Sequence, residues 1–361
     1  MQSDIKPSRA RRGSRGRKGN KRANATGLQQ IAWQVPKNTD TPIAPLPPEG
    51  VAAIHHTAMR ILEEVGVEFL NLEAVDTLRQ AGCTILNETR DGALVKMDRA
   101  FVMDKISHAP AKFLITPRNL DRQIIIGGQH MVFGSIASPP NCSDLDRGRR
   151  PGDRQSHQDL VKLSQFFNCI HFIGGYPVEP VDSHASVRHL DCLHDQLTLS
   201  GKVVHAYSLG AGRVDDVIEM VRIAGGLTEQ EFAQTPRMFT NINSTSPLKH
   251  DFPMLDGLMR LSRCGQPTIV TPFTLAGAMS PITLAGTVAQ SIAEALCAIV
   301  LIQIINPGCP CAIGTFSSNV DMKTGAPAFG TPEYMRATQM TGQMARYYKI
   351  PMRSSGVCTS N

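Results

Sequence analysis

Small polar residues gather where the predicted strands of this chain end. Apolar runs continue into hydroxyl and amide side chains at residues 205–208, 240–248, 271–277, 314–319 and 353–356. Hydrogen-bonding groups with little charge suit a polar ligand face, or a large ligand that is held by many weak contacts. The alternative is that each Asn, Ser or Thr caps the helix that follows it. Both explanations stay open at this point.

The densest group of histidines lies in residues 184–194, which read HASVRHLDCLH. On a helix with 100° per residue, His189 and Cys192 share a face, whereas His184 and His194 point away from them. The segment also lacks the HExxH pattern of helical zinc sites. A surface helix with mixed contacts is therefore favoured over a metal centre.

The chain shows little machinery for acid–base or nucleophilic catalysis. It contains no GxSxG elbow, and Asp144 and Asp146 in CSDLDRGRR are interpreted as loop or turn residues. Cys309 and Cys311 have a spacing that fits neither a zinc knuckle nor a redox motif, and both are interpreted as buried apolar residues. If the chain is an enzyme, a cofactor or a partner must supply the reactive group.

The elements that would position the polar strand ends begin at about residue 155. The predicted strands are residues 171–173, 202–207, 237–242, 267–271 and 310–316, with a further strand starting near Pro351. The predicted helices are residues 185–199, 215–224, 252–263, 284–305 and 333–348. Repeated strand–helix units predict an α/β fold with a parallel sheet, and an open doubly wound sheet and a (β/α)8 TIM barrel both fit. No glycine-rich phosphate loop follows a strand, which weakens the nucleotide-binding alternative.

Two further sections precede these units. Residues 1–48 are predicted to form a disordered basic leader and a Pro-rich linker, and residues 49–150 an N-terminal α+β section of helices and hairpins. Its predicted helices are 51–65, 72–81 and 98–108, and GGQ at 127–129 predicts a turn that pairs strands at 124–126 and 131–133. Residues 151–361 are expected to form the barrel, with its last units missing.

Composition and charge narrow the classes of function. The 361 residues are 42% hydrophobic and 5% aromatic, which argues against stacked aromatic platforms for single-stranded nucleic acid. Residues 1–22 carry a formal charge of +8, whereas the whole chain carries +6. The other residues therefore sum to −2. Because Gly and Ser dilute this charge, the tail is interpreted as a solvated arm, with an arm that binds nucleic acid as the alternative.

The sequence also predicts a compartment. No secretory signal is visible near the N-terminus. The apolar run 288–305 contains Gln290, Glu294 and Gln303, which predicts a buried helix and not a membrane span. Nine scattered cysteines are usual in a reducing compartment. We therefore expect a cytoplasmic protein that binds neither membrane nor nucleic acid.

Several long motifs of the chain resemble the trimethylamine methyltransferase family. They are SPITLAGTVAQSIAEALCAIVLIQIINPGCP, FSSNVDMKTGAPAFGTPE and ARYYKIPMRSSG, supported by AIHHTAMRILEEVGVEF, HAPAKFLITPRN and NSTSPLKHD. The motifs occur in the family's order and run over nearly the whole chain. The resemblance implies a TIM barrel that moves a methyl group from a methylated amine to the cobalt of a separate corrinoid protein, with no tightly bound cofactor of its own.

The resemblance further implies a branch of this family. In one branch a pyrrolysine follows the segment that resembles YKIPMRSSG, and the matching position here is Cys358. An ordinary residue there places the chain in the branch that lacks pyrrolysine, whose members act on quaternary amines such as glycine betaine. Family chains continue beyond Asn361, so we expect a fragment, with an inactive relative that binds a betaine or a corrinoid protein without turnover as the alternative.

Candidate substrate contacts follow from that chemistry. Aromatic faces hold a quaternary ammonium by cation–π contacts, and a substrate carboxylate requires a donor. The expected partners are a corrinoid protein and a small methylated amine, and a homo-oligomer is left open. The substrate-binding residues expected on this basis are His205, Tyr207, Asn243, Ser246, Phe273, Thr315, Phe316 and Arg353.

Overall fold

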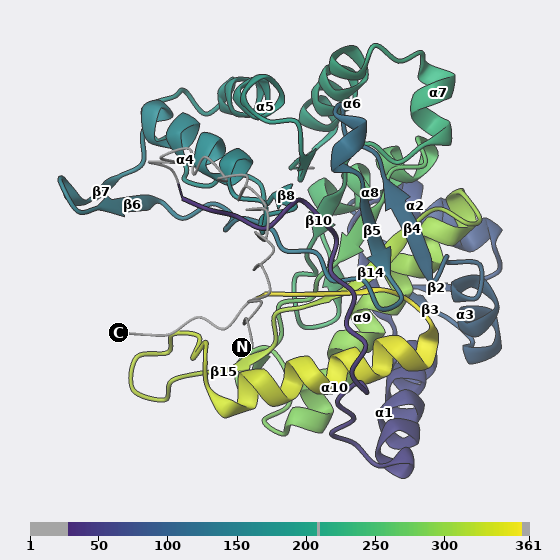
Figure 1. Cartoon of the computed structure of the whole chain (residues 1–361). Helices are drawn as coiled ribbons and strands as arrows, with labels where there is room; N and C mark the ends of the chain where they lie inside the picture. The colour runs from purple at the N-terminus through teal and green to yellow at the C-terminus, as the bar shows by residue number, and fades with distance from the viewer. Residues whose placement is uncertain (1–27, 208–209, 356–361) are drawn as a thin grey trace, which may run out of the picture. The chain divides into compact units, whose positions relative to one another are not determined.

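Six parallel strands in chain order form the centre of the fold (Figure 1). The computed structural model describes residues 28–207 and 210–355. The strands are β8 (Phe172–Ile173), β9 (Val203–Val204), β10 (Thr240–Ile242), β12 (Thr268–Val270), β14 (Cys311–Thr315) and β16 (Met352–Ser354). Each is hydrogen-bonded in parallel to the next, and a single bridge between His205 and Phe239 joins β9 to β10.

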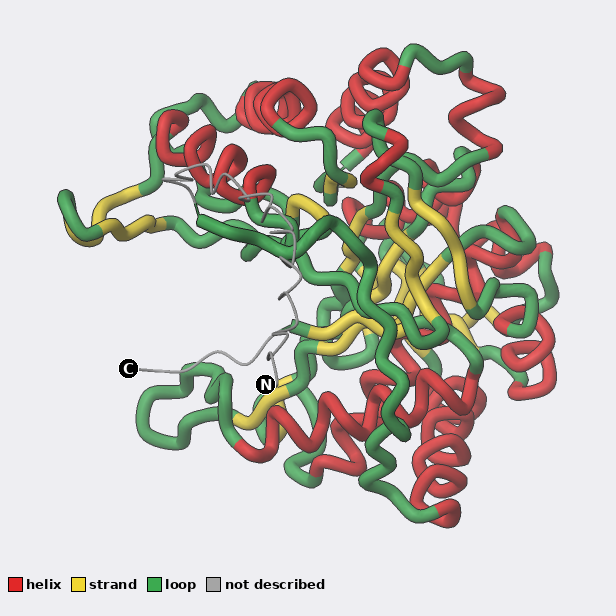
Figure 2. The backbone as a smooth tube through the Cα atoms, viewed as in Figure 1, coloured by secondary structure: helices red, strands yellow, loops and turns green. Residues whose placement is uncertain are grey.

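Helices connect these strands and cover the sheet (Figure 2). They are α5 (Arg188–Leu199), α6 (Ala211–Gly225), α7 (Glu229–Gln234), α8 (Phe252–Arg263), α9 (Leu284–Ile305) and α10 (Pro332–Tyr348). A doubly wound sheet reverses its strand order at a switch point, and this sheet does not. The α/β class is confirmed, and the sheet does not close into a barrel within the described residues, so the complete (β/α)8 barrel stays a prediction.

The N-terminal helices pack on α9. α1 (Pro48–Arg60) continues as a π-helical turn, η1 (Ile61–Val65), and ends at Gly66, whose φ of 89° suits glycine. It shares one buried core with α2 (Leu72–Gln80), α3 (Arg99–Ile106) and α9. α9 is long and apolar enough to cross a membrane, but 89% of its apolar window is buried in the protein. The prediction of a buried helix is therefore confirmed.

A small mixed sheet ties the N-terminal section to the loop after β10. Its order is β11–β1–β3–β2, with β1 (Val67–Phe69), β2 (Thr84–Leu86), β3 (Ala93–Lys96) and β11 (Lys249–His250). β11 pairs in parallel with β1, through Glu68 with Lys249 and Phe69 with His250. The loop after β10 is thus fixed at its far end by the N-terminal section.

The predicted hairpin of 124–126 with 131–133 is wrong. β5 (Ile124–Gly127) pairs instead with β4 (Lys112–Ile115), and residues 131–133 are not a strand. Met131 donates its backbone N–H to the Pro36 carbonyl, and Phe133 donates to His171 Nδ1. The β4–β5 pairing is favoured over the predicted hairpin because it buries the apolar side chains of both strands. They form one cluster under the sheet together with Val203, Phe239, Ile269 and Ala312.

A second hairpin extends beside α4 (Arg154–Phe166) in Figure 1. It consists of β6 (Asn141–Asp144) and β7 (Gly148–Pro151). Asp146 lies in the turn as predicted, whereas Asp144 is the last residue of β6, where its carboxylate accepts hydrogen bonds from Arg147 and Arg150. The remaining short elements are η2 (Leu120–Arg122), β13 (Leu275–Ala276) and β15 (Ser318–Asn319).

The described residues from Trp33 onward form one compact unit. The section boundaries at residues 48 and 150 stay predictions. Residues 1–22, with their basic arm, lie outside the described part of the chain, as does Cys358.

Candidate functional site

The inner face of the parallel sheet changes from apolar to polar along each strand. The cluster with Val203, Phe239, Ile269 and Ala312 fills the end at which the strands begin. Because side chains alternate with a period of two, the next inward positions are His205, Asn241, Thr271, Gly314 and Arg353. These five residues lie on one face of the sheet toward the carboxyl ends of the strands, where the Asn241 N–H bonds His205 and Arg353 acts on His205. We call them the polar layer.

The lack of a side chain at Gly314 leaves room for Thr271 in this layer. A Cβ placed on Gly314 would lie 2.0 Å from Thr271 Oγ1 and 2.9 Å from Thr271 Cα. No side chain fits at those distances, so the position requires glycine although its φ is ordinary. On its other side β14 pairs with β16, and Gly314 is in register with Arg353. Thr271 and Arg353 therefore share a face, and the residue between them on β14 is a glycine without a side chain.

Arg353 is a largely buried cation with no counter-anion. Burial is the main cause that lowers the pKa of its guanidinium, and the ionisable groups that act on it in the other direction are the phenols of Tyr334 and Tyr207. None of the ion pairs found in the described residues includes Arg353. An arginine keeps its proton under these conditions, so the site holds an uncompensated positive charge that favours an anionic ligand.

His205 lies in the same layer and is fixed as the neutral imidazole. Its Nδ1 donates to the Gly174 carbonyl at 3.1 Å, and its Nε2 accepts from the Asn241 backbone N–H at 3.2 Å. The pKa of His205 is lowered to about 4, mainly by burial, with a smaller effect of Arg353 in the same direction and an opposing effect of the Gly174 hydrogen bond. Both ring nitrogens are used inside the fold, so His205 does not offer the free donor that the sequence predicted.

Two polar atoms of the layer have no hydrogen-bond partner. Thr271 Oγ1 and Asn241 Oδ1 are buried, and neither bonds to any group in residues 28–207 or 210–355. A buried polar atom without a partner costs about 1–3 kcal/mol and marks a place where a ligand or water belongs. Sequence analysis missed both residues, although both lie at the ends of predicted strands, in the polar segments that it singled out.

Aromatic side chains stand on two sides of the polar layer. Phe273 and Phe316 follow β12 and β14, and their ring centroids lie 5.4 Å apart. Phe329 lies 4.6 Å from Phe316, and buried Tyr334 completes this group. No Lys or Arg of the described residues lies over the faces of Phe273 or Phe316, because the cation–π pairs found there involve other rings.

The second aromatic group lies at β9. Tyr207 and Tyr176 meet edge to face with centroids 4.6 Å apart, and the Tyr207 hydroxyl hydrogen-bonds Ser138. His205 stacks on Phe239 at 5.1 Å. Burial raises the pKa of the Tyr207 phenol, which therefore stays neutral. The sequence predicted Tyr207, Phe273 and Phe316 as an aromatic set; the structure places them on two sides of Arg353.

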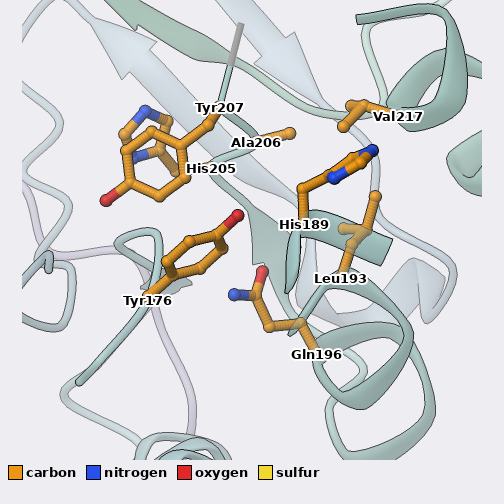
Figure 3. A pocket seen from close by; sticks show the side chains of 8 residues that line it. All are labelled: Tyr176, His189, Leu193, Gln196, His205, Ala206, Tyr207 and Val217. Atoms are coloured by element: carbon orange, nitrogen blue, oxygen red, sulfur yellow. The ribbon is translucent and has the colours of Figure 1, made fainter. Parts of the chain in front are cut away.

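Figure 3 shows a small cavity behind this second group. Tyr176, His205 and Tyr207 lie on one side of it, and His189, Leu193 and Gln196 on the other. Its volume is about 10 Å³, close to the minimum for a single water, so it is too small for a methylated amine.

The exposure of the side chains in the histidine segment agrees with the helical pattern. His189 and Cys192 are both buried on α5, whereas the His194 side chain is 64% exposed and His184 precedes the helix. His189 Nε2 lies 2.8 Å from Asp216. Among the described residues, no group of three or more His, Cys, Asp or Glu side chains is arranged to hold a metal ion.

Three other predicted site residues have different surroundings. Ser246, in the loop after β10, is buried and donates to Glu294, and Thr315 is buried and bonds Ser317. Thr315 points away from the Arg353 face because it follows inward-facing Gly314 by one residue in β14. Asn243 is exposed, one step past β10 and two residues after Asn241, and its contact with a ligand stays a prediction.

Glu294, in the middle of α9, holds the loop that follows Asn243. The carboxylate is fully buried and accepts from the hydroxyls of Ser244 and Ser246, from the Leu248 N–H at 2.8 Å, and from Gln290 at 2.8 Å. All four partners are neutral donors, which together stabilise an ionised carboxylate. This network fixes residues 244–248 against the core helix.

The buried histidines predict how stability depends on pH. Burial is the largest cause that lowers the pKa of His157, His171, His205 and His250. In the unfolded chain they titrate near 6.5, so lowering the pH from 6.5 to 5 protonates the unfolded state first and reduces stability, by up to about 1.4 kcal/mol per pH unit for each histidine. Carboxylates with lowered pKa values, such as Glu63, lose their contribution only below about 4.5.

Urea unfolding at pH 6.5 and pH 5 tests this prediction. His205→Asn keeps a donor toward Gly174 and removes the titrating group, so its loss of stability over that interval is expected to be smaller than that of the parent chain. An unfolding free energy that stays constant or rises as the pH falls would contradict the assignment of neutral buried histidines.

Comparisons with known proteins show the family of the chain. Residues 11–361 match the family described as trimethylamine methyltransferase (MTTB). The chain is 35% identical to the glycine betaine methyltransferase of Desulfitobacterium hafniense (strain Y51), an alignment that covers 85% of this chain and 63% of that protein. It is 27% identical to the proline betaine:corrinoid methyltransferase of Eubacterium limosum, over 84% of this chain and 63% of that protein.

A further relative is the trimethylamine methyltransferase MttB of Desulfitobacterium hafniense (strain DSM 10664 / DCB-2), 27% identical over 85% of this chain and 61% of that protein. The chain thus spans a little under two thirds of the length of these relatives. Among solved structures, the crystal structure of the hydroxylamine MtmB complex aligns with 84% of this chain and 71% of that chain, with a TM-score of 0.49 and 9% identity.

Proposed function

The chain belongs to the trimethylamine methyltransferase family, and from this membership we propose that it transfers a methyl group from a quaternary amine that carries a carboxylate, such as glycine betaine, to the cobalt of a separate corrinoid protein. The observation that supports this choice of substrate is Arg353, a buried cation without a counter-anion at the polar layer. Trimethylamine has no anionic group that would use it. A cytoplasmic location and assembly with a corrinoid partner belong to the same proposal.

The two ends of a betaine fit the two kinds of group in the site. The guanidinium of Arg353 binds the carboxylate with two parallel hydrogen bonds, and the unpartnered Thr271 Oγ1 donates a further one. The quaternary ammonium then lies against the half-buried rings of Phe273 and Phe316, where cation–π attraction holds it. The residues present thus orient the substrate with its methyl groups toward the open end of the sheet.

The reaction needs no proton transfer from the protein. The corrinoid acceptor supplies the nucleophile, and the bond that breaks is the one between nitrogen and the transferred methyl carbon. The electron pair of that bond remains on nitrogen, so the amine leaves as a neutral tertiary amine. A site with a neutral His205 and without a free carboxylate suits this chemistry, in which binding and orientation are the protein's contribution.

A panel of small amines tests the substrate class. Isothermal titration calorimetry is expected to show binding of glycine betaine, weaker binding of choline, and no measurable binding of trimethylamine or acetate alone. Choline has the same ammonium without a carboxylate, so its difference from glycine betaine isolates the contribution of Arg353. Equal binding of glycine betaine and choline would contradict the assignment of a carboxylate site.

A further inference from the structure

We propose that the chain has a second binding site, for a small organic anion with an apolar part, at the end of the sheet where β9 and β10 begin. A cavity of about 280 Å³ opens there. Cationic and apolar side chains share its lining, among them Arg118, Lys202 and Arg237 with Leu197, Val204 and Val221. This site is separate from the Arg353 layer and does not rest on the proposed methyl transfer.

Successive side chains of β9 face opposite sides of the sheet, and this separates the two sites. Val203 and His205 face the inside of the sheet, whereas Val204 packs with Leu193 and Val221 on the side of the helices. Lys202 and Val204 line the cavity, so it lies between the sheet and the ends of α5 and α6. A ligand bound there would not touch the groups around Arg353.

The lining of this cavity is cationic, and exposed Glu231 acts electrostatically on Arg237 from outside the lining. Three of its lining residues are cationic and none is acidic, and Arg122 lies close enough to Lys202 to lower the pKa of its ammonium. Within the described residues no ion pair includes Arg118, Arg122, Lys202 or Arg237. The Nε atoms of Arg122 and Arg237 are also buried without a hydrogen-bond partner. Such a cluster is stabilised by a bound anion.

Among the described residues, Lys202 is the lining cation whose charge is used by backbone carbonyls. Its ammonium donates to the Ser164 and Phe167 carbonyls at the end of α4. At the end of α6, Arg222 donates to the Leu227 carbonyl at 2.8 Å, and the N–H groups of Gly226 and Leu227 close the helix. Since these ends are satisfied by other donors, the guanidinium groups of Arg118 and Arg237 remain for a ligand.

The volume of the cavity and the residues that line it determine which class of anion fits. The cavity volume is near the lower limit of ligand pockets, which suits a small metabolite and excludes a nucleotide. Leucine and valine side chains form its wall, so the ligand needs an apolar part beside its anionic group. A phosphate monoester and a carboxylate share this chemistry, and arginine pairs with both.

Calorimetric titration with phenyl phosphate, butyrate and inorganic phosphate tests the proposal. We expect phenyl phosphate or butyrate to bind with a Kd of about 1 mM or tighter. Stronger binding of phenyl phosphate than of butyrate would identify a phosphate site, and the reverse a carboxylate site. Glycine betaine in excess is expected to leave this binding unchanged, which separates the second site from the proposed substrate site.

Two variants and a matched control locate the binding. Arg118→Gln and Arg237→Gln are each expected to weaken it about tenfold or more, since each removes hydrogen bonds to a charged group. Arg149→Gln, in the exposed β6–β7 hairpin, is expected to leave it unchanged. Arg118 is exposed, so its variant keeps the test valid if Arg237→Gln unfolds. No binding of any of the three anions at 10 mM, or equal binding by all three variants, would overturn the proposal.

Discussion

Arg353→Met is expected to weaken binding of glycine betaine by about 100-fold or more, because it removes the charged partner of the carboxylate from a buried site. The same substitution is expected to leave the free energy of unfolding unchanged or to raise it. In the unbound protein Arg353 is a desolvated cation without an anion, and replacing it by an apolar side chain of similar length removes that penalty. Loss of binding together with retained stability is the signature of a residue kept for function.

Choline and a second arginine variant provide the controls for this experiment. Choline binding is expected to change little in Arg353→Met, because the aromatic faces of Phe273 and Phe316 remain. Arg90→Met, which changes a fully solvated surface arginine, is expected to bind both ligands as the parent chain does. If Arg353→Met loses both ligands equally, or unfolds more easily than the parent, the arginine has a structural role and the carboxylate assignment is wrong.

Glu294→Ala is expected to lower the free energy of unfolding by about 3–5 kcal/mol. The substitution leaves four donors, from Ser244, Ser246, Leu248 and Gln290, without their acceptor in the core. It also opens a space in the fully buried middle of α9. The loop after Asn243 would lose its anchor, so we expect weaker glycine betaine binding as well.

Urea unfolding of three proteins measures this effect. Glu294→Gln keeps one acceptor oxygen and the side-chain volume, and its stability is expected to lie between those of the parent chain and Glu294→Ala. Glu219→Ala, which removes an exposed carboxylate from a surface pair with Arg222, is expected to change stability by less than about 1 kcal/mol. A Glu294→Ala variant within 0.5 kcal/mol of the parent would show that the network is dispensable.

The parts of the fold that local chemistry determines could be predicted. The bounds of α8 and α9 are those expected from their apolar pattern and their caps. Thr331 caps α10 by accepting a hydrogen bond from the Tyr334 N–H, a local effect of the kind that a sequence shows. The alternation of strands and helices was enough for the parallel sheet. The strand order, which distinguishes a singly wound sheet from a doubly wound one, depends on contacts between distant segments and required the structure.

The parts that depend on tertiary pairing could not be predicted. The partner of β5 is decided by the apolar cluster that β4 completes with four strands, and no local turn signal contains that information. Glu294 was visible only as an acid in an apolar run. Its role comes from a loop about 50 residues earlier in the chain, which the helix pattern cannot reveal.

The residues of the candidate site also divide into those that could be predicted and those that could not. Arg353 was predicted because a substrate carboxylate requires a donor and this arginine stands at a predicted strand end, and the structure brings it close to His205, Tyr207 and Tyr334. Asn241 and Thr271 were missed because one residue of shift along a strand decides whether a side chain faces the ligand or the helices. The same shift explains why Thr315, which was predicted, faces away from Arg353 in β14.

The most direct test of the central claim is a methyl-transfer assay of this chain with cob(I)alamin as the acceptor and glycine betaine as the donor. Cobalt absorbance follows the methylation of the corrinoid, and mass spectrometry of the mixture detects the demethylated amine. The account predicts methylated corrinoid and dimethylglycine in equal amounts with glycine betaine, and neither product with trimethylamine or with Arg353→Met. Binding of glycine betaine without any methyl transfer, or transfer from trimethylamine alone, would contradict it.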